Sequence, residues 1–263
     1  MAEADRIPDR IDTTPRFTAE DAARLERRFE GRDASAMLEA VLREGLAGNI
    51  AVVSSFGAES SVLLHLVASI DPNVAVLFLD TGKHFPETLA YRDLIAGLLN
   101  LGDLRNIAPE PAAVAANDES GLRWSYDPDG CCDLRKTLPL AAELAGFDAS
   151  ITGRKAFQAA TRRNLPRFEI DASDGMGRLK INPLIDWSPE RLASYMADHG
   201  LPPHPLVEKG YPSIGCSPCT SKVAPGEDPR AGRWRGWDKT ECGIHAPGGG
   251  DQGELPPGYD PVF

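Results

Sequence analysis

The sequence lacks a hydrophobic run long enough to cross a lipid bilayer. The longest nearly apolar stretch, residues 62–70, has nine residues and contains His65, whereas a spanning helix needs about 20. The first ten residues alternate in charge and contain no hydrophobic stretch, so we expect neither a secretory signal nor a membrane partner. A cytoplasmic location is the expectation that follows.

An excess of positive charge is also missing. The chain has 28 Lys and Arg against 39 Asp and Glu, which gives a formal net charge of −11. Binding along a nucleic-acid backbone requires a broad basic face, so we expect no nucleic acid among the partners. Basic residues gathered at one place could still bind a small anion.

Cysteine is scarce, and its number is odd. Five cysteines in a reducing compartment make a disulfide framework a poor expectation and favour a metal site or a reactive thiol. The remaining composition, 42% apolar and 25% charged, is ordinary for a globular protein. At 263 residues the chain can form one domain or two small ones.

Short β-branched runs alternate with helical segments from residue 50 onward, a pattern typical of a doubly wound, Rossmann-like α/β sheet. The pattern predicts strands over 50–55, 74–80, 104–108 and 149–152, a hairpin or an edge excursion within 168–181, and helices over 18–29, 34–46, 60–69, 86–99, 131–145 and 188–199. We expect a helical lead-in over 1–48, a nucleotide-binding α/β domain over 49–222, and a C-terminal arm over 223–263. The Gly- and Pro-rich residues 246–263 are expected to be mobile.

The loop after the first predicted strand is the first candidate binding element. Residues 54–60 read Ser-Ser-Phe-Gly-Ala-Glu-Ser and join a strand to a helix, which is where open α/β sheets bind nucleotides through backbone N–H groups and a helix N-terminus. The loop is neither a Walker loop nor a G-x-G-x-x-G motif, so a serine-rich turn capped by Ser60 is the alternative. Asp80 and Thr81 end the second strand and are expected beside this loop, which favours a nucleotide pocket.

Four of the five cysteines form two pairs. Cys131 and Cys132 are adjacent, and Cys216 and Cys219 form a C-x-x-C motif. Together they provide the four thiolates of a zinc site or an iron–sulfur cluster; a thioredoxin-like redox motif and four unlinked thiols are the alternatives. Adjacent ligands are unusual for structural zinc, so the pattern favours a [4Fe–4S] cluster. Lys136 lies one helical turn from Cys132, where it could offset the charge of the cluster. The alternative is that Arg135 and Lys136 form a solvated helix face.

The fifth cysteine, Cys242, lies in a basic segment near the end of the chain. Lys239 and His245 flank it at three residues on either side, and either would favour the thiolate. Three arginines of the same segment could hold an oxyanion substrate: Arg230, Arg233 and Arg235. We hypothesise an arm that brings a nucleophile to the nucleotide pocket; an ordinary lone thiol is the alternative.

Taken together, these segments resemble the assimilatory adenylyl-sulfate (APS) reductases of the wider APS/PAPS reductase family. The resemblance covers about residues 50–245. It is carried by residues 54–60, 79–88, 131–136, 182–187, 204–206, 210–220 and 239–245.

The resemblance implies the Rossmann-like fold of the adenine-nucleotide α-hydrolases and one [4Fe–4S] cluster per subunit on Cys131, Cys132, Cys216 and Cys219. It implies that Cys242 is the catalytic residue, attacking the sulfate sulfur of APS, expelling AMP and leaving an S-sulfocysteine. Thioredoxin or a glutaredoxin would then release sulfite, for assimilation towards cysteine. The sequence leaves the oligomeric state open, a homo-oligomer included.

Residues and resemblance together give one set of candidate substrate-binding residues: Ser54, Ser55, Gly57, Asp80, Thr81, Lys136, Arg154, Lys155, Arg230, Arg233 and His245. The family loop commonly reads S-F-S-G-A-E-D, so individual roles in residues 54–60 are open by one position. Arg154 and Lys155 are alternative candidates for the same substrate-binding role. The spacing from Arg230 and Arg233 to Cys242 is short, so Arg235 is expected as a substitute for one of these two arginines.

Three other functions compete with this interpretation. A reductase of PAPS, or of both nucleotides, is the nearest, and the cluster cysteines favour APS. An ATP-pyrophosphatase of the same fold would need an S-G-G-x-D-S loop, which residues 54–60 do not match. A non-enzymatic zinc or redox-sensing module is the alternative from another class.

Overall fold

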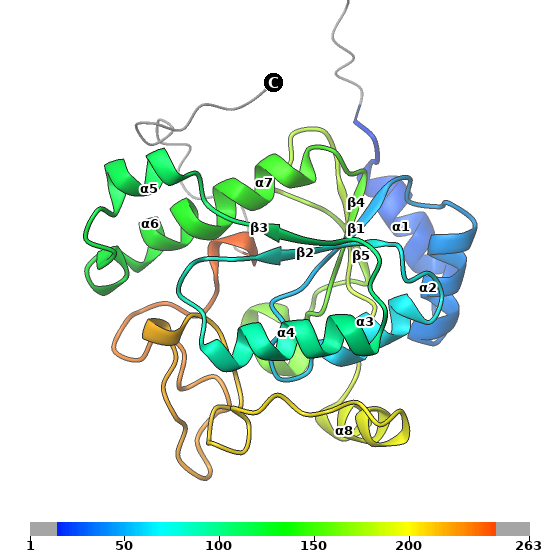
Figure 1. The fold of residues 1–263 in the computed structure, drawn as a ribbon. Helices are drawn as coiled ribbons and strands as arrows, with labels where there is room; N and C mark the ends of the chain where they lie inside the picture. The colour runs from blue at the N-terminus through cyan, green and yellow to red at the C-terminus, as the bar shows by residue number, and fades with distance from the viewer. Residues whose placement is uncertain (1–14, 246–263) are drawn as a thin grey trace, which may run out of the picture.

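The computed structural model describes residues 15–245, shown as a ribbon in Figure 1. The predicted mobile segment, residues 246–263, lies outside the described residues. Within residues 15–245, no helix combines the length and apolar character that crossing a membrane requires.

Six strands form one sheet in the order β3-β2-β1-β4-β6-β5. Their bounds are Ile50–Val53 (β1), Ala75–Leu79 (β2), Leu104–Ile107 (β3), Ala149–Thr152 (β4), Phe168–Ile170 (β5) and Leu179–Ile181 (β6). All neighbours are parallel except β5, which runs antiparallel to β6. Val52 lies between Val76 of β2 and Ile151 of β4. The doubly wound sheet and the hairpin are therefore confirmed.

Eight α-helices are found in the described chain: Ala19–Arg28 (α1), Ala34–Arg43 (α2), Ser60–Ala68 (α3), Pro86–Leu98 (α4), Pro111–Asn117 (α5), Pro128–Cys132 (α6), Leu138–Leu144 (α7) and Pro189–Asp198 (α8). Local signals explain several ends. Thr18 and Asp21 form a reciprocal capping box at α1, and the hydroxyl of Ser188 accepts a hydrogen bond from the N–H of Arg191 at α8. The expected end of α2 at residue 46 is wrong, because Gly45 adopts a φ of 65° that a helix cannot continue.

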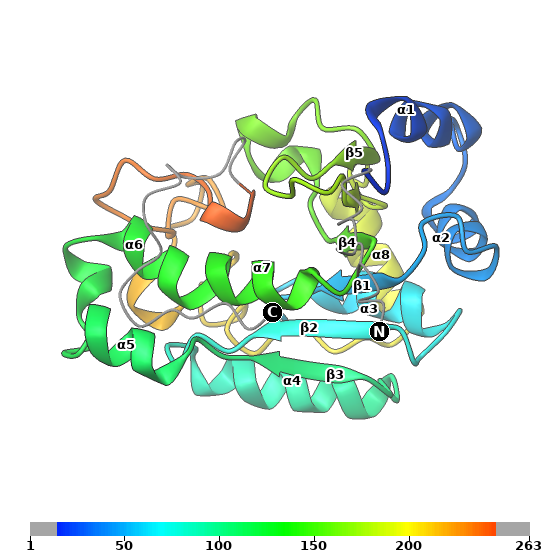
Figure 2. The ribbon, with the colours of Figure 1, turned by 90° about the horizontal axis from the view of Figure 1, so that it is seen from above.

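Two hydrophobic layers cover the two faces of the sheet. Helices α1, α2, α3, α4 and α8 pack on one face, with Met37, Leu64 and Ile95 fully buried among them. Helix α7 covers the other face, where Leu140 and Leu144 pack against the strands. Figures 1 and 2 show α7 on the opposite side of the strands from α3 and α4. Both layers leave the carboxyl ends of the strands free for a binding site.

The segment with the first cysteine pair departs from the predicted helix over 131–145. Cys131 and Cys132 end α6 instead of beginning a helix, and a π-helical turn, η2 (Asp133–Thr137), connects α6 to α7. Such turns insert an extra residue and are frequent at functional sites. The insertion is not visible in apolar periodicity, which is why the expectation was wrong at this point.

Arg135 in that turn is buried, so the interpretation of it as a solvated helix face is wrong. Its guanidinium donates to the carboxylate of Asp118 at 2.7 and 3.1 Å and to the carbonyl oxygen of Thr81 at 2.9 Å. The side chain of Asp118 is 0% exposed and that of Arg135 is 9% exposed. Burial would raise the pKa of Asp118, but its hydrogen bonds and the charge of the guanidinium together lower it. The pair ties the cysteine-bearing turn to the end of β2.

Replacing Asp118 by Asn should lower the free energy of unfolding by about 3–5 kcal/mol, because the guanidinium of Arg135 would stay buried without its counter-charge. Urea unfolding measures the change. Glu44→Gln is the matched control, since it breaks the exposed pair with Arg28 and should cost at most about 1 kcal/mol. A loss below about 1 kcal/mol for Asp118→Asn would contradict the assigned role.

Candidate active site

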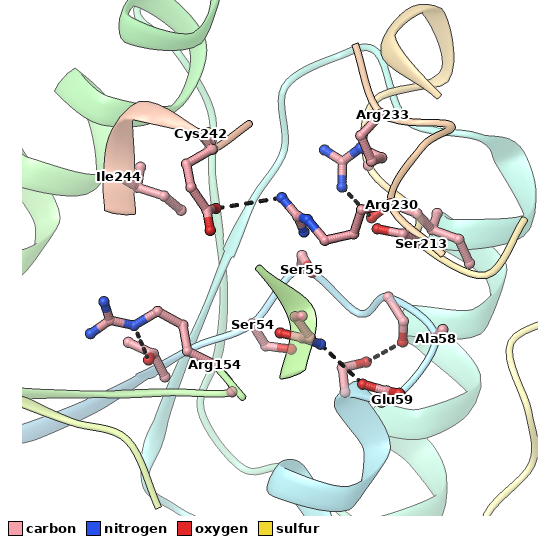
Figure 3. A pocket seen from close by; sticks show the side chains of 18 of the residues that line it. Ser54, Ser55, Ala58, Glu59, Arg154, Ser213, Arg230, Arg233, Cys242 and Ile244 are labelled. Carbon is pink, nitrogen blue, oxygen red and sulfur yellow. Dashed lines mark hydrogen bonds and ion pairs between the residues drawn. The ribbon is translucent and has the colours of Figure 1, made fainter. Parts of the chain in front are cut away.

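A cavity of about 260 Å³ opens at the carboxyl ends of β1 and β4. This is the point where the strand order reverses, since β2 and β3 lie on one side of β1 and β4 on the other. Figure 3 shows Ser54 and Ser55 between Arg154 on one side and Arg230 and Arg233 on the other. The cavity is lined by ten of the predicted substrate-binding and catalytic residues: Ser54, Ser55, Gly57, Thr81, Lys136, Arg154, Lys155, Arg230, Arg233 and Cys242.

Two predicted substrate-binding residues are not placed at the cavity. Asp80 does not line it, because its carboxylate accepts a hydrogen bond from the N–H of Gly82 and stabilises the turn after β2. The side chain of His245 lies outside the described residues. Arg235, the proposed substitute, pairs with Glu227 at 3.0 Å and does not line the cavity, so that expectation is wrong.

The loop over residues 54–60 is anchored by Phe56. Its ring is fully buried and lies edge-on to Phe78, with centroids 5.6 Å apart. Phe56 has a φ of 47°, which is rare for a bulky residue and is typical of a functionally constrained turn. The hydroxyl of Ser60 donates to the carbonyl oxygen of Gly57 at 2.7 Å, and Glu59 takes the cap position of α3. The expectation that Ser60 caps this helix is therefore wrong.

Four of the cations that line the cavity already face a carboxylate. These ion pairs are Arg154 with Glu169, Lys155 with Glu59, Arg162 with Glu241, and Arg230 with Glu241. Burial lowers the pKa of Lys155 and that of Arg154, and it lowers the pKa of Arg230 to about 10. The competition between Arg154 and Lys155 thus has a structural basis, because each is held by a glutamate from a different segment.

Lys136 and Arg233 differ from these four, because neither forms an ion pair with any carboxylate of residues 15–245. Arg233 donates only a long hydrogen bond of 3.4 Å, to the carbonyl oxygen of Ile214, and its Nε atom is buried without a partner. Burial would lower the pKa of Lys136, but the neighbouring thiolates of Cys242 and Cys216 raise it. Both cations are therefore available to an anion in the cavity.

The two cysteine pairs come together beside these cations. Cys131 lies close enough to Cys216 and Cys219 for their charges to affect it, and burial raises its pKa to about 11. The hydroxyl of Thr81 contacts the Sγ atom of Cys216 at 3.3 Å. Cys219 belongs to a short 3-10 turn, η5 (Ser217–Cys219), instead of opening a helix after a strand, which disfavours a thioredoxin-like motif. In the described part of the chain, no three His, Cys, Asp or Glu side chains are arranged around a single-ion site.

Cys242 joins the same cluster from the arm. It is buried and packs with Cys132 and Trp234. The 3-10 turn that follows it, η6 (Gly243–His245), contacts the π-helical turn. Lys239, predicted to flank the thiol, pairs with Asp129 and lies 5.6 Å from the centroid of the Trp234 ring. The arm thus brings Cys242 to the cavity that Lys136 and Arg233 also line.

Four residues that line the cavity were not predicted from the sequence: Gln158, Arg162, Trp234 and Glu241. Most of them act through partners far along the chain; Arg162 and Glu241 are 79 residues apart. The one local signal was the position of Glu241 directly before Cys242.

The family model and the most similar sequences point to one family, and a solved structure shares the fold. A model of the phosphoadenosine phosphosulfate reductase domain matches residues 49–222. A Mesorhizobium japonicum protein named adenosine 5′-phosphosulfate reductase is 51% identical, over 81% of this chain and 82% of its own. A Chelativorans protein of the same name is 47% identical, over 87% and 92%. The crystal structure of a Candida auris phosphoadenylyl-sulfate reductase shares the fold, with a TM-score of 0.63 at 24% identity, over 79% of this chain and 98% of its own.

A methyl group at position 215 would disturb the cavity, because a Cβ atom on Gly215 would overlap the guanidinium of Arg233. Gly215→Ala should displace that guanidinium and weaken AMP binding about tenfold, the equivalent of one charge-assisted hydrogen bond. Calorimetric titration measures the affinity. Gly175→Ala is the control, since its Cβ would meet nothing within 4 Å. Unchanged AMP affinity in Gly215→Ala would show that Arg233 does not face the bound anion.

Proposed function

Because this chain belongs to the phosphoadenosine phosphosulfate reductase domain family, we propose that it reduces adenosine 5′-phosphosulfate to sulfite and AMP in sulfate assimilation. One observation carries the proposal: the buried thiol of Cys242 shares a cavity with two cations, Lys136 and Arg233, that form no ion pair with a described carboxylate. A nucleophile beside unpaired positive charge suits an anionic electrophile. The names of the two relatives favour APS over PAPS as the substrate.

Substrate binding follows from the chemistry of the cavity walls. The loop over residues 54–57 offers small side chains and backbone N–H groups, which suit the phosphate. Lys136 and Arg233 offer the charge that the phosphosulfate group needs before a thiolate can approach it. Three further cations keep their glutamate partners and contribute to the electrostatic field of the cavity: Arg154, Lys155 and Arg230.

The proposed reaction has two steps at Cys242. The thiolate attacks the sulfate sulfur; an S–S bond forms, the bond from that sulfur to the phosphate oxygen breaks, and AMP leaves with the bonding electrons. A thiol of thioredoxin or a glutaredoxin then attacks the Sγ atom of Cys242 and releases sulfite with its electron pair. The second thiol of the same protein closes its disulfide and frees Cys242. The dithiol thus supplies both electrons.

The four paired cysteines suit an iron–sulfur cluster by the chemistry of the donor set. The group consists of thiols alone, with cations beside it and with the indole Nε1 of Trp234 buried without a partner. Cys131, Cys132, Cys216 and Cys219 would hold one [4Fe–4S] cluster per subunit. When bound, the cluster supplies a fixed negative charge near Lys136. Because the dithiol supplies both electrons, no electron needs to pass through that site.

We propose several further features together with this function. They are the domain limits at residues 48/49 and 222/223, the thioredoxin or glutaredoxin partner, a cytoplasmic location and a homo-oligomeric assembly. A non-enzymatic zinc or redox-sensing module is the competing function. Metal content distinguishes it, since the protein proposed here is brown and carries about four irons per chain, whereas a zinc module is colourless.

Serine variants should divide the five cysteines into one catalytic and four cluster-binding residues. Cys242→Ser should keep its colour, iron and AMP affinity but lose turnover by roughly a thousandfold or more, because a hydroxyl is far less ionised than a thiol. Cys216→Ser and Cys219→Ser should instead lose iron and stability. Iron analysis and sulfite release measure the two effects. Sulfite release by Cys242→Ser at the wild-type rate would exclude the mechanism.

Substrate choice is tested by rates on the two nucleotides. The purified protein should turn over APS at least about a hundredfold more efficiently than PAPS, because the cations of its cavity other than Lys136 and Arg233 are paired with glutamates and are not available to a 3′-phosphate. The measurement is kcat/KM on each nucleotide with the same thioredoxin. A preference for PAPS would overturn the assignment.

A further inference from the structure

Glu241, directly before the nucleophile, is clamped by an arginine from a distant segment. Both oxygens of its carboxylate accept hydrogen bonds from Arg162, one from Nε and one from Nη2, each at 2.6 Å. The hydroxyl of Thr161 adds a third hydrogen bond at 3.2 Å. Two parallel charge-assisted hydrogen bonds are the strongest arrangement between these groups and fix their relative orientation.

A second arginine, Arg230, lies in the arm itself and contacts Glu241 and its neighbour Thr240. Nη2 of Arg230 donates to the carbonyl oxygen of Thr240 at 2.8 Å and to the carboxylate of Glu241 at 3.4 Å. Figure 3 marks the contact of Arg230 with a dashed line. Arg230 thus braces the segment before Cys242 within the arm, whereas Arg162 ties Glu241 to the rest of the cavity wall.

The clamp continues to the nucleotide loop. Arg162 donates through Nη1 to the amide oxygen of Gln158 at 2.7 Å, and the amide nitrogen of Gln158 donates to Glu59 at 3.1 Å. Glu59 ends the loop after β1 and accepts a further hydrogen bond from Lys155 at 2.9 Å. A continuous chain of polar contacts thus links the loop that would face the phosphate to the residue beside the nucleophile.

Burial makes this clamp more than a surface ion pair. The side chains of Arg162 and Glu241 are each 9% exposed, so solvent screens their attraction weakly. A different ion pair of the arm, Glu227 with Arg235, is 37% and 49% exposed and lies away from the cavity. The pair of Glu241 with Arg162 is thus the buried ion pair that joins the segment before Cys242 to the rest of the chain; Lys239 adds a second contact, with the exposed carboxylate of Asp129.

We propose that Glu241 is a positioning residue, whose carboxylate latches the arm onto Arg162 and so holds Cys242 at the cavity before any substrate arrives. The inference rests on the proposed function, because docking of the arm matters for catalysis only if Cys242 is the nucleophile. Cys242 is buried in the docked arm, which suits attack on a small nucleotide and denies access to a protein dithiol. The latch must therefore hold for the first step and release for the second.

The test uses the iron-loaded full chain without nucleotide. Cys242 is modified by a small reagent, iodoacetamide, and by a bulky polyethylene-glycol maleimide, and the rates are followed on the Cys242 peptide by mass spectrometry. In Glu241→Gln, the ratio of the bulky to the small reagent rate should rise about tenfold over wild type. Glu227→Gln, the matched control on the same arm, should keep the wild-type ratio within about twofold.

The ratio separates opening of the arm from a change in thiol ionisation. A shift in ionisation raises both rates equally and leaves the ratio unchanged, and that result would overturn the proposal. Arg162→Lys keeps the positive charge but loses the paired hydrogen bonds, so it should raise the ratio to an intermediate value. Iron content, measured for each variant, establishes that the fold is retained.

A second readout concerns the two chemical steps. Glu241→Gln should slow formation of the S-sulfo adduct from APS at least about tenfold, whereas thioredoxin should release sulfite from the preformed adduct no more slowly than in wild type. Equal slowing of both steps would contradict a latch. If wild type forms no adduct at all, the proposed function fails, and the reagent ratio still decides whether the latch exists.

Discussion

Two cations without carboxylate partners, Lys136 and Arg233, are the constraint on which the rest of the site depends. Burying a charge without a counter-charge is costly, and among the described residues the other cavity cations are each matched by a glutamate. What remains near Lys136 and Arg233 is a group of thiols and the space of the cavity. The charges of Lys136 and Arg233 are therefore balanced only when anions lie on both sides of them: thiolates on one side and an anionic ligand on the other.

The fold brings this arrangement about through three segments that meet at one edge of the sheet. The reversal of strand order at β1 opens the cavity between β1 and β4, and the buried ring of Phe56 fixes the loop above it. The pair of Asp118 and Arg135 ties the π-helical turn to the end of β2, which sets the position of Lys136 next in sequence. The arm then closes the site through Glu241.

The sequence was sufficient for features that depend on local composition. Strands β1, β2 and β4 are β-branched or apolar runs bounded by turn residues, and they appear within two residues of their predicted limits. The paired cysteines were also recognisable, because their spacing is itself the signal. Long-range pairing was not recognisable: nothing near Arg162 indicates Glu241, 79 residues away. The π-helical turn likewise leaves no trace in the apolar periodicity.

The central claim, that Cys242 is the nucleophile facing the two available cations, is tested most directly by the mass of one peptide. Iron-loaded protein is incubated with APS in the absence of any thiol, digested and analysed for each cysteine. The account predicts that the Cys242 peptide alone gains the mass of one SO₃ group, in an amount equal to the AMP released, and that thioredoxin removes it as sulfite. An adduct on another cysteine, or release of AMP and sulfite without an adduct, would contradict it.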